Sequence, residues 1–380
     1  MTLGLRQRKI LQIGKYYPPE HGGMESHLAN LCQGLSQYFD ISVLVANRNR
    51  VTQRESVGPI NVVRAGRWMN IAGAPLCPVM PWFIRQMQPD LIHLHVPNPG
   101  GVISLILSNY RGPLVVTYHS DVLRQGFLIP IFQPVLDRTL SQSRAIIATS
   151  QTYIETSPVL KRFSQRCRVI PLGIDIGACN PRTAELATEI KQTYPGPIVL
   201  AVGRLVYYKG FEYLIHAMQD IQATLLVIGE GPLRASLEAL VVEYAVSERV
   251  KILGSVPNVE PYMEAADVFV LPSIARTEAF GLVQLEAMVR GKPVVNTNIP
   301  SGVPFVSPHQ ISGLTVLPRD PAALAEAINQ LLACPELRRR YGQAGRKRVE
   351  DEFSIASMVR QTMVIYEAVL EADVHRGDDC

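Results

Sequence analysis

Several features that would place a protein in a special class are missing from these 380 residues. Hydrophobic runs are short and interrupted, and none approaches the ~20 residues that a membrane-spanning helix needs. The basic start, Met1–Lys9, lacks the apolar core that follows in a secretory signal. Six cysteines are scattered without a Cys-x-x-Cys pair, which argues against a zinc site or a disulfide framework. We therefore expect reduced thiols and a cytoplasmic location.

Acidic residues are scarce in the first part of the chain. Residues 1–172 carry 18 Lys and Arg against 8 Asp and Glu, a net charge of +10, and the remainder carries 19 against 25. A basic half favours an anionic partner such as a phosphate-bearing ligand, an acidic membrane surface or nucleic acid. An evenly spread, solvated surface would explain the same balance. Because no basic stripe interleaved with aromatics marks a nucleic-acid module, we expect no nucleic-acid partner.

Apolar, strand-like runs alternate with helix-length segments along the chain. A first series covers residues 10–13, 41–45, 61–64, 91–95, 114–117, 145–148 and 169–171, and a second covers 198–202, 225–228, 250–253, 268–271, 293–296 and 314–317. Continuous apolar runs are typical of strands covered on both faces, as in a parallel α/β sheet. The sequence therefore predicts an α/β fold of two doubly wound domains with a cleft between them.

The apolar pattern breaks after Leu172, where a stretch with Gly177, Asn180 and Pro181 indicates an inter-domain linker. We expect an N-terminal domain, a linker and a C-terminal domain at residues 1–172, 173–182 and 183–355. Asp320 before a proline is a helix start signal. A final amphipathic helix is expected at 356–372.

Two carboxylates eight residues apart flank a glycine turn in the C-terminal half. Glu278 and Glu286 enclose Phe280-Gly281-Leu282, and an apolar helical pattern follows. The glycine favours a loop that leads into a helix, with Glu278 before the helix and Glu286 on it. Backbone N–H groups at such a helix start suit phosphates, and the carboxylates suit sugar hydroxyls. Exposed glutamates near helix starts also occur for dipole reasons alone.

Two further glycine motifs follow strand-like runs. The stretch 203–210 places Arg204 and Lys209 between glycines, a spacing that fits a diphosphate clamp or a solvated turn. The stretch 18–25 contains Gly22 and Gly23 before a helix-like segment, where a ligand can approach the backbone closely. The alternative for this pair is a plain loop.

Together these three motifs resemble glycosyltransferase family 4, whose members have the GT-B fold. The resemblance covers essentially the whole chain and includes two more segments, 118–121 and 229–232. It implies two Rossmann-like domains that face a central cleft. The N-terminal domain would bind the acceptor and the C-terminal domain the nucleotide sugar. The final helix would pack back on the N-terminal domain.

The resemblance also assigns roles to residues. It implies that Arg204 and Lys209 hold the donor diphosphate, aided by backbone groups at Gly22 and Gly23. Glu278 would hold hydroxyls of the donor sugar, and His119 would contact that sugar near the reacting centre. His119, Arg204, Lys209 and Glu278 are therefore the expected catalytic residues. The other expected donor-binding residues are Asp121 near His119, Val256 and Pro257 at the base, Phe280, Gly281 and Leu282 at the diphosphate, and Glu286 at the ribose.

Other histidines carry weaker signals. His21 stands beside the glycine pair and is open to either interpretation. His93 and His95 alternate along a strand-like run, so we expect them to be structural.

The resemblance implies a retaining reaction. No carboxylate is clearly placed as a nucleophile for double displacement, so a front-face mechanism is expected. No Asp-x-Asp motif is present, and no metal or other cofactor is expected. A glucan synthase or an epimerase on the same fold is the main alternative. A dinucleotide oxidoreductase is disfavoured because no Gly-x-Gly-x-x-Gly follows a strand.

We expect a nucleotide-diphosphate hexose as donor, with GDP-mannose the first choice and UDP-hexoses open. The acceptor is expected to be a glycan or lipid-linked glycan in bacterial surface polysaccharide or glycolipid synthesis. Apolar and aromatic segments of the N-terminal half, with Arg67, Arg85 and Arg124 nearby, fit a surface that lies on a membrane; they are residues 68–71, 81–85 and 126–132. Core helices and crossover loops would explain them equally. The hypothesis is a peripheral contact with the anionic inner face of the cytoplasmic membrane.

Overall fold

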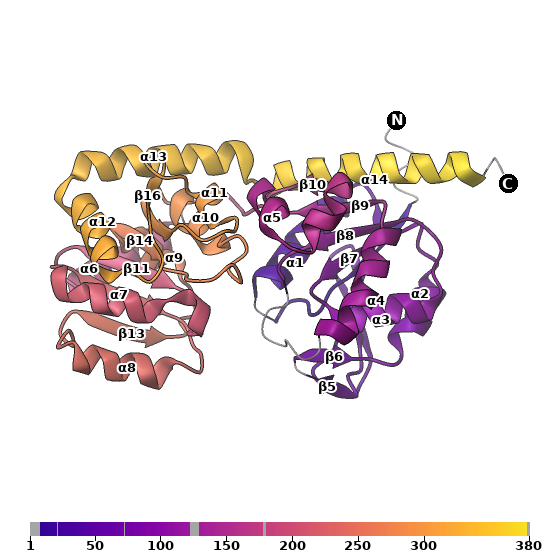
Figure 1. The fold of residues 1–380 in the computed structure, drawn as a ribbon, viewed down its shortest axis with the longest axis horizontal. Helices are drawn as coiled ribbons and strands as arrows, with labels where there is room; N and C mark the ends of the chain where they lie inside the picture. Colours follow the sequence, from indigo (N-terminus) through magenta and orange to yellow (C-terminus); the bar gives the residue numbers. More distant parts are fainter. Residues whose placement is uncertain (1–7, 21, 72, 122–128, 178–179, 378–380) are drawn as a thin grey trace. The chain divides into compact units, whose positions relative to one another are not determined.

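The computed structural model of the protein describes residues 8–20, 22–71, 73–121, 129–177 and 180–377. Its internal contacts divide the chain into two compact units, residues 1–173 with 355–380 and residues 174–354 (Figure 1). The two ends of the second unit lie side by side, because the backbone N–H of Ile174 donates to the carbonyl of Phe353 at 2.9 Å. No helix among the described residues is both long and apolar enough to cross a bilayer.

The first unit is built on an eight-stranded sheet with the order β10-β9-β8-β7-β1-β2-β4-β3. Its strands are β1 (Lys9–Ile13), β2 (Asp40–Ala46), β3 (Gln53–Val57), β4 (Ile60–Ala65), β7 (Leu91–Val96), β8 (Leu114–Tyr118), β9 (Ala145–Ala148) and β10 (Cys167–Val169). All neighbours pair in parallel except β3, which is an antiparallel edge. A small hairpin is formed by β5 (Met69–Ile71) and β6 (Ala74–Leu76).

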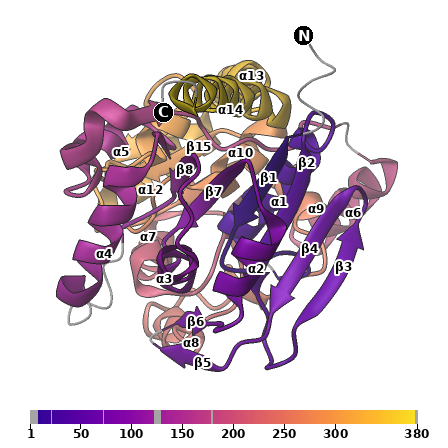
Figure 2. The same cartoon turned by 90° about the vertical axis from the view of Figure 1, so that its right-hand side faces the viewer.

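Helices of the first unit supply the apolar layers. They are α1 (Gly23–Leu35), α2 (Met80–Met87), α3 (Pro99–Ser108), α4 (Ile129–Gln142), α5 (Gln151–Thr156), η2 (Leu160–Arg166) and α14 (Ile355–Gly377). The C-terminal helix α14 packs against α1, and Figure 2 shows it nearly end-on. Leu28 and Leu31 of α1 share one core cluster with Met358 and Tyr366 of α14. The last helix is therefore an integral part of the first unit.

The second unit has a six-stranded parallel sheet with the order β13-β12-β11-β14-β15-β16. Its strands are β11 (Ile198–Val202), β12 (Thr224–Ile228), β13 (Val250–Gly254), β14 (Val268–Leu271), β15 (Val294–Thr297) and β16 (Gly313–Val316). Its helices are α6 (Pro181–Thr193), η3 (Tyr207–Lys209), α7 (Phe211–Ala217), η4 (Met218–Asp220), α8 (Arg234–Glu243), α9 (Glu260–Ala265), α10 (Leu282–Val289), α11 (Val303–Val306), α12 (Pro321–Ala333) and α13 (Pro335–Glu352). The core lies between the sheet and these helices.

The predicted apolar runs correspond to the parallel strands, with shifts of a few residues at their ends. The prediction of a strand at 169–171 is displaced, because the edge strand β10 ends at Val169. Strand β3 and the β5–β6 hairpin carry no apolar run and were not predicted. All five residues of β3 are exposed, so its pairing depends on the neighbouring β4 rather than on burial.

Helix α12 begins where the sequence predicts. The Asp320 side chain accepts a hydrogen bond from the backbone N–H of Ala323 at 3.0 Å, and Pro321 occupies the first turn. A capped N–H and a proline that needs no hydrogen-bond partner fix the start of the helix.

We predict that Asp320→Ala lowers the free energy of unfolding by about 1 kcal/mol, because the cap hydrogen bond is lost. Asp320→Asn retains a side-chain oxygen and should stay close to the wild type. Urea unfolding followed by circular dichroism measures both. Equal losses in the two variants would contradict the capping role.

Candidate functional site

Three glycines shape the carboxyl edge of the sheet in the second unit. Gly203, Gly229 and Gly254 stand at the ends of β11, β12 and β13, and backbone hydrogen bonds link them in a row. The N–H of Gly203 donates to Ile228 at 2.9 Å, and that of Gly229 donates to Gly254 at 2.8 Å. At Gly229 (φ 144°) an added Cβ would collide with the carbonyl oxygen of Gly203. The three strand ends therefore carry no side chain of their own, and polar side chains pack close to two of them: Lys209 beside Gly203, and Glu230 and Arg234 beside Gly254.

A buried ion pair lies at the same edge. Nζ of Lys209, from η3, is 2.7 Å from Oε2 of Glu278, and their side chains are only 10% and 12% exposed. The Ser273 hydroxyl donates a further, longer hydrogen bond to the same carboxylate oxygen at 3.4 Å. The structure thus brings together two predicted residues that are 69 positions apart in the chain, and holds a cation beside a carboxylate with little solvent.

Helix α10 begins directly after this carboxylate. Gly281 precedes the first helical residue and has φ 75°, a backbone conformation that favours glycine. Leu282 starts the helix, Glu286 lies one turn later, and Phe280 is buried with its ring 6.0 Å from that of Phe353. The predicted loop-then-helix arrangement is confirmed.

Glu286 and Arg204 lie around the ion pair. Surrounding protein reduces the hydration of the Glu286 carboxylate and raises its pKa, the nearby Lys209 ammonium opposes this shift, and Glu260 adds to it. The Glu286 side chain nevertheless remains exposed to solvent. Arg204 follows β11 and is exposed.

Tyr208 is a neighbour that the sequence analysis did not single out. Burial raises the pKa of its hydroxyl, Glu278 raises it further, and Lys209 and Arg204 oppose the shift. The Tyr208 hydroxyl is therefore electrostatically coupled to the three expected catalytic charges of this unit. Val256 and Pro257 lie in the loop after β13, with Val256 half-buried and Pro257 exposed.

The predicted residues of the first unit lie at the carboxyl edge of its own sheet. His119 follows β8 and is buried, with its N–H bonded to the carbonyl of Val96 at 2.8 Å. Gly22 and Gly23 are exposed at the start of α1. Gly22 has φ 168°, an extended conformation open to any residue, and a Cβ at Gly23 would meet nothing within 4 Å. Exposure, rather than backbone strain, makes this turn accessible.

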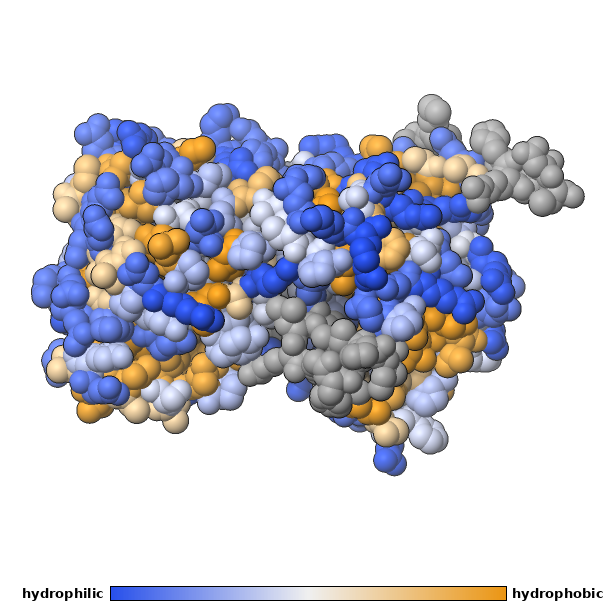
Figure 3. All heavy atoms as spheres, viewed as in Figure 1, coloured by the Kyte–Doolittle hydropathy of each residue, from blue (hydrophilic) through white to orange (hydrophobic). Residues whose placement is uncertain are grey.

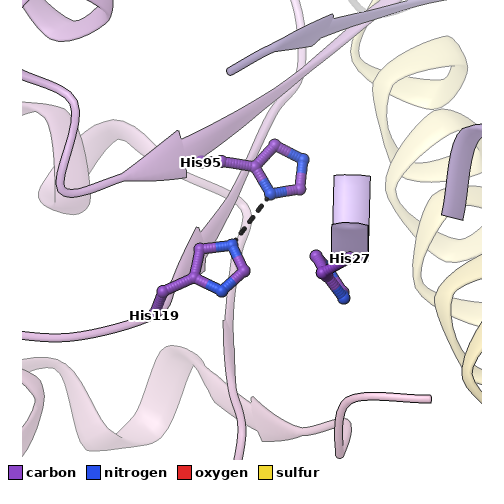
Figure 4. Close-up of side chains that lie close together, drawn as sticks. All are labelled: His27, His95 and His119. Atoms are coloured by element: carbon purple, nitrogen blue, oxygen red, sulfur yellow. Dashed lines mark hydrogen bonds between the residues drawn. The ribbon is translucent and has the colours of Figure 1, made fainter. Parts of the chain in front are cut away.

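Three imidazoles meet beside that turn (Figure 4). Nδ1 of His95 and Nε2 of His119 are hydrogen-bonded at 3.1 Å, and His27 of α1 places its ring centroid 4.9 Å from that of His119. Burial lowers the pKa of His27 to about 4 and the pKa values of His95 and His119 well below 6.5. All three rings are therefore neutral at physiological pH.

The three rings are close enough to raise the question of a metal. One nitrogen of each lies within 4.8 Å of the others, and both nitrogens of the buried His27 have no partner among the described residues. Imidazole nitrogens are ligands for several transition metals. The closest pair, His95 and His119, already shares a hydrogen bond, so a metal would have to displace it.

Asp121 is buried and engaged with the protein. Its Oδ1 accepts hydrogen bonds from the hydroxyls of Tyr118 at 2.9 Å and Ser157 at 2.7 Å. Its backbone N–H donates to the Tyr153 hydroxyl at 2.7 Å. These contacts anchor the loop that carries His119. His21 and the segment 122–128 lie outside the described residues.

Sequence reasoning missed His27 and the contact between His95 and His119. A usable signal was present: His93 and His95 project to the same side of β7, and His95 pairs in register with Thr117 of β8. Polar residues repeated at every second position of a buried strand need partners on the same face.

Comparisons with known proteins agree with this architecture. Residues 21–177 match the family model of Glycosyltransferase Family 4, and residues 187–348 match Glycosyl transferases group 1. O-antigen chain mannosyltransferase C of Escherichia coli is 28% identical over 96% of this chain and 99% of its own length. D-rhamnosyltransferase WbpZ of Pseudomonas aeruginosa is 30% identical over 91% of this chain and 92% of its own length.

Solved structures show the same fold. Sucrose-phosphate synthase from Thermosynechococcus elongatus aligns with a TM-score of 0.80 and 25% identity, covering 96% of this chain and all of that one. Anabaena HepE, solved with UDP-glucose, aligns with a TM-score of 0.75 and 20% identity over 95% of this chain and 99% of that one. The chain belongs to glycosyltransferase family 4, and its two Rossmann-like units are those of the GT-B fold.

Proposed function

We propose that the protein is a retaining hexosyltransferase that moves a sugar from a nucleotide-diphosphate donor to a glycan or lipid-linked acceptor of bacterial surface polysaccharide or glycolipid. The observation that carries the proposal is the buried Lys209–Glu278 pair, 2.7 Å apart at the carboxyl edge of the second sheet. A cation and a carboxylate at one point match the two parts of such a donor, its diphosphate and its sugar hydroxyls.

Binding of the donor would separate the Lys209 ammonium from the Glu278 carboxylate. The Lys209 ammonium would turn to the diphosphate together with Arg204, and the N–H groups that begin α10 at Gly281 and Leu282 would face the same oxygens. Glu278 would then accept from sugar hydroxyls. The positive charge would stabilise the leaving diphosphate as its negative charge grows.

The remaining expected contacts follow the same edge. Glu286 would accept from the ribose hydroxyls, Phe280 would support the turn that holds the diphosphate, and the loop with Val256 and Pro257 would lie along the base. From the first unit, the exposed turn at Gly22 and Gly23 would contribute backbone N–H groups. His119 would contact the sugar near the reacting carbon, and Asp121 would hold the His119 loop in place.

A front-face mechanism suits the described residues. Double displacement needs a carboxylate placed to attack the anomeric carbon, and the motifs clearly place none there. In a front-face step the leaving phosphate oxygen accepts the acceptor's proton while the new glycosidic bond forms on the same face. The charge of the leaving group would be met by Arg204 and Lys209 without a metal ion.

We predict that the product keeps the anomeric configuration of the donor. NMR of the glycoside formed reads the configuration through the one-bond carbon–proton coupling at the anomeric carbon, which the glycosidic bond locks in place. An inverted product would contradict the front-face step and leave the donor assignment intact.

Mannose is our first choice of sugar, with GDP-mannose as donor. Relatives named for mannosyl transfer support it, including O-antigen chain mannosyltransferase C and a phosphatidyl-myo-inositol mannosyltransferase of Mycobacterium leprae, 28% identical over 92% of this chain. The HepE structures with UDP and UDP-glucose keep UDP-hexoses as the second choice.

We predict that one nucleotide sugar from a panel of GDP- and UDP-hexoses raises the melting temperature by about 5 to 10 °C at a hundredfold excess over its Kd. A chelator should leave this shift unchanged, because no metal is needed. Lys209→Met and Glu278→Gln should each abolish the shift. Differential scanning fluorimetry measures the melting temperature with the sugar panel, with the chelator and in the two variants.

Because single changes leave a buried charge unpaired, the double variant Lys209→Met with Glu278→Gln serves as a folded reference. Lys347→Met removes the same charge from an exposed ion pair with Asp351 on α13 and should behave as wild type. If no nucleotide sugar stabilises folded wild-type protein, the proposed function fails.

A surface of the first unit supports contact with a membrane. Trp68, Met69 and Trp82 are 63%, 58% and 55% exposed, and Leu107 of α3 is 59% exposed. Figure 3 shows apolar side chains gathered over α2 and α3. Four large apolar side chains in water on neighbouring elements favour an interfacial role over a purely structural one. The contact would be peripheral and on the cytoplasmic face.

The arginines that the sequence predicts beside the membrane surface make contacts within the protein instead. Arg85 donates to the carbonyls of Leu107 and Ser108 at the end of α3, and Arg67 donates to the carbonyl of Arg48. Arg124 lies outside the described residues. A cavity of about 460 Å³ at the amino edge of β8, β9 and β10, opposite to His119, offers better candidates for anionic headgroups. Its lining includes Arg111, Arg138, Arg144 and Arg166.

We predict that Trp68→Ser and Trp82→Ser each lower partitioning into anionic vesicles about tenfold, because an apolar anchor is lost. Val364→Ser, which alters a 65% exposed residue of α14, is the matched control. Co-sedimentation with anionic and neutral vesicles measures the effect. Unchanged partitioning of both tryptophan variants would remove the membrane hypothesis.

A further inference from the structure

A row of hydrogen bonds runs through the interior of the first unit and ends at His119. Its members are Gln12 on β1, His93 and His95 on β7, and Tyr366 on α14, and all are buried. Gln12 pairs in register with His93 across the sheet. In an interior that is otherwise apolar, such groups must partner one another.

The contacts follow one another without a gap. Nε2 of Gln12 donates to the Tyr366 hydroxyl at 2.8 Å, and that hydroxyl lies 2.6 Å from Nδ1 of His93. At the other end of the amide, Oε1 of Gln12 is 2.9 Å from Nε2 of His95. Nδ1 of His95 is in turn 3.1 Å from Nε2 of His119.

The position of each proton follows from these contacts. Burial lowers the pKa of His93 to about 3 and that of His95 well below 6.5, so each ring is neutral and carries one proton. The Gln12 oxygen faces His95, so His95 carries its proton on Nε2 and accepts at Nδ1. His119 must then carry its own proton on Nε2. Its Nδ1 remains a lone pair.

The orientation of the Gln12 amide gives the row its direction. Because the Tyr366 oxygen accepts from Nε2 of Gln12, its single proton can be donated to Nδ1 of His93, 2.6 Å away. Nε2 of His93 then carries the ring proton and donates to the Thr117 hydroxyl at 2.6 Å. If the amide were reversed, every donor along the row would reverse and Nδ1 of His119 would carry the proton.

We propose that Gln12 and Tyr366 are positioning residues that hold His119 with its proton on Nε2, so that Nδ1 accepts a hydrogen bond from a hydroxyl of the donor sugar. This inference rests on the proposed function for the contact between His119 and the sugar. Among the described residues, the His119 side chain makes its hydrogen bond through Nε2, to His95, and none through Nδ1. The sugar must therefore offer a hydroxyl that can donate at this point.

The proton positions can be measured directly by long-range proton–nitrogen NMR on the full-length chain with ¹⁵N-labelled histidine. The expected wild-type spectrum has His119 in the Nε2–H form, assigned by comparison with His119→Gln. Tyr366→Phe keeps the aromatic ring but removes the hydroxyl, and should give a mixture of the two tautomers. An Nδ1–H form in the wild type would overturn the proposal.

Tyr110→Phe is the matched control. It removes a tyrosine hydroxyl from the same unit, where that hydroxyl donates to the carbonyls of Pro89 and Pro113 at 3.3 Å. It should leave the His119 spectrum unchanged. Equal changes of the His119 spectrum in both variants would indicate that Tyr366 has only a general structural role.

Kinetics then test the consequence for the sugar. In Tyr366→Phe the KM for the donor should rise about two- to fivefold, in proportion to the lost fraction of the competent tautomer, with kcat nearly unchanged. A donor analogue with fluorine in place of the contacted hydroxyl should bind wild type and Tyr366→Phe equally, because fluorine cannot donate. An altered tautomer with an unaltered KM would overturn the positioning role. Absence of any donor binding would instead refute the proposed function, since the spectrum is read without a donor.

Discussion

The two sheets are covered on both faces, and this constraint places the candidate residues. Strand β7 is buried along its whole length, as are β8, β14 and β15. Backbone groups inside such a sheet are already paired, so chemistry is confined to the strand ends and the loops that leave them. His119 follows β8, and the Gly203 turn that leads to Lys209 follows β11. Each unit therefore presents its candidate side chains at a carboxyl edge.

Much of this arrangement could be predicted because its signals are local. A continuous apolar run such as 91–96 identifies a covered strand, and Gly281 between two glutamates predicts a turn before a helix. Strand β3 could not be predicted in the same way, because its five residues are all exposed and it exists through pairing with β4. The contact between Lys209 and Glu278 likewise depends on the three-dimensional path of two separate turns, although each motif was recognisable alone.

The environment of His119 could not be predicted from local sequence signals. The sequence pattern predicts that His93 and His95 are structural residues of a strand, and both are buried. What connects them to His119 is the register of β1, β7 and β8 together with a tyrosine that is 247 positions after His119 on α14. Periodicity along one strand gives no information on which helix covers it. The C-terminal helix therefore contributes a polar group as well as apolar packing.

The net charge of each half of the chain and the charges at its candidate site suggest different ligand-binding regions. The basic balance of residues 1–172 suggests an anionic ligand there, yet the histidines at the edge of the first sheet are neutral, and burial is the reason. The cations that suit a diphosphate, Arg204 and Lys209, lie in the half with more acidic residues. The buried Lys209 ammonium beside one carboxylate has a defined position, whereas exposed arginines, Arg204 included, are solvated and screened by salt. Charge at the strand ends, rather than charge per domain, therefore distinguishes the two candidate sites: the second unit has a buried cation beside a carboxylate, and the first has neutral imidazoles.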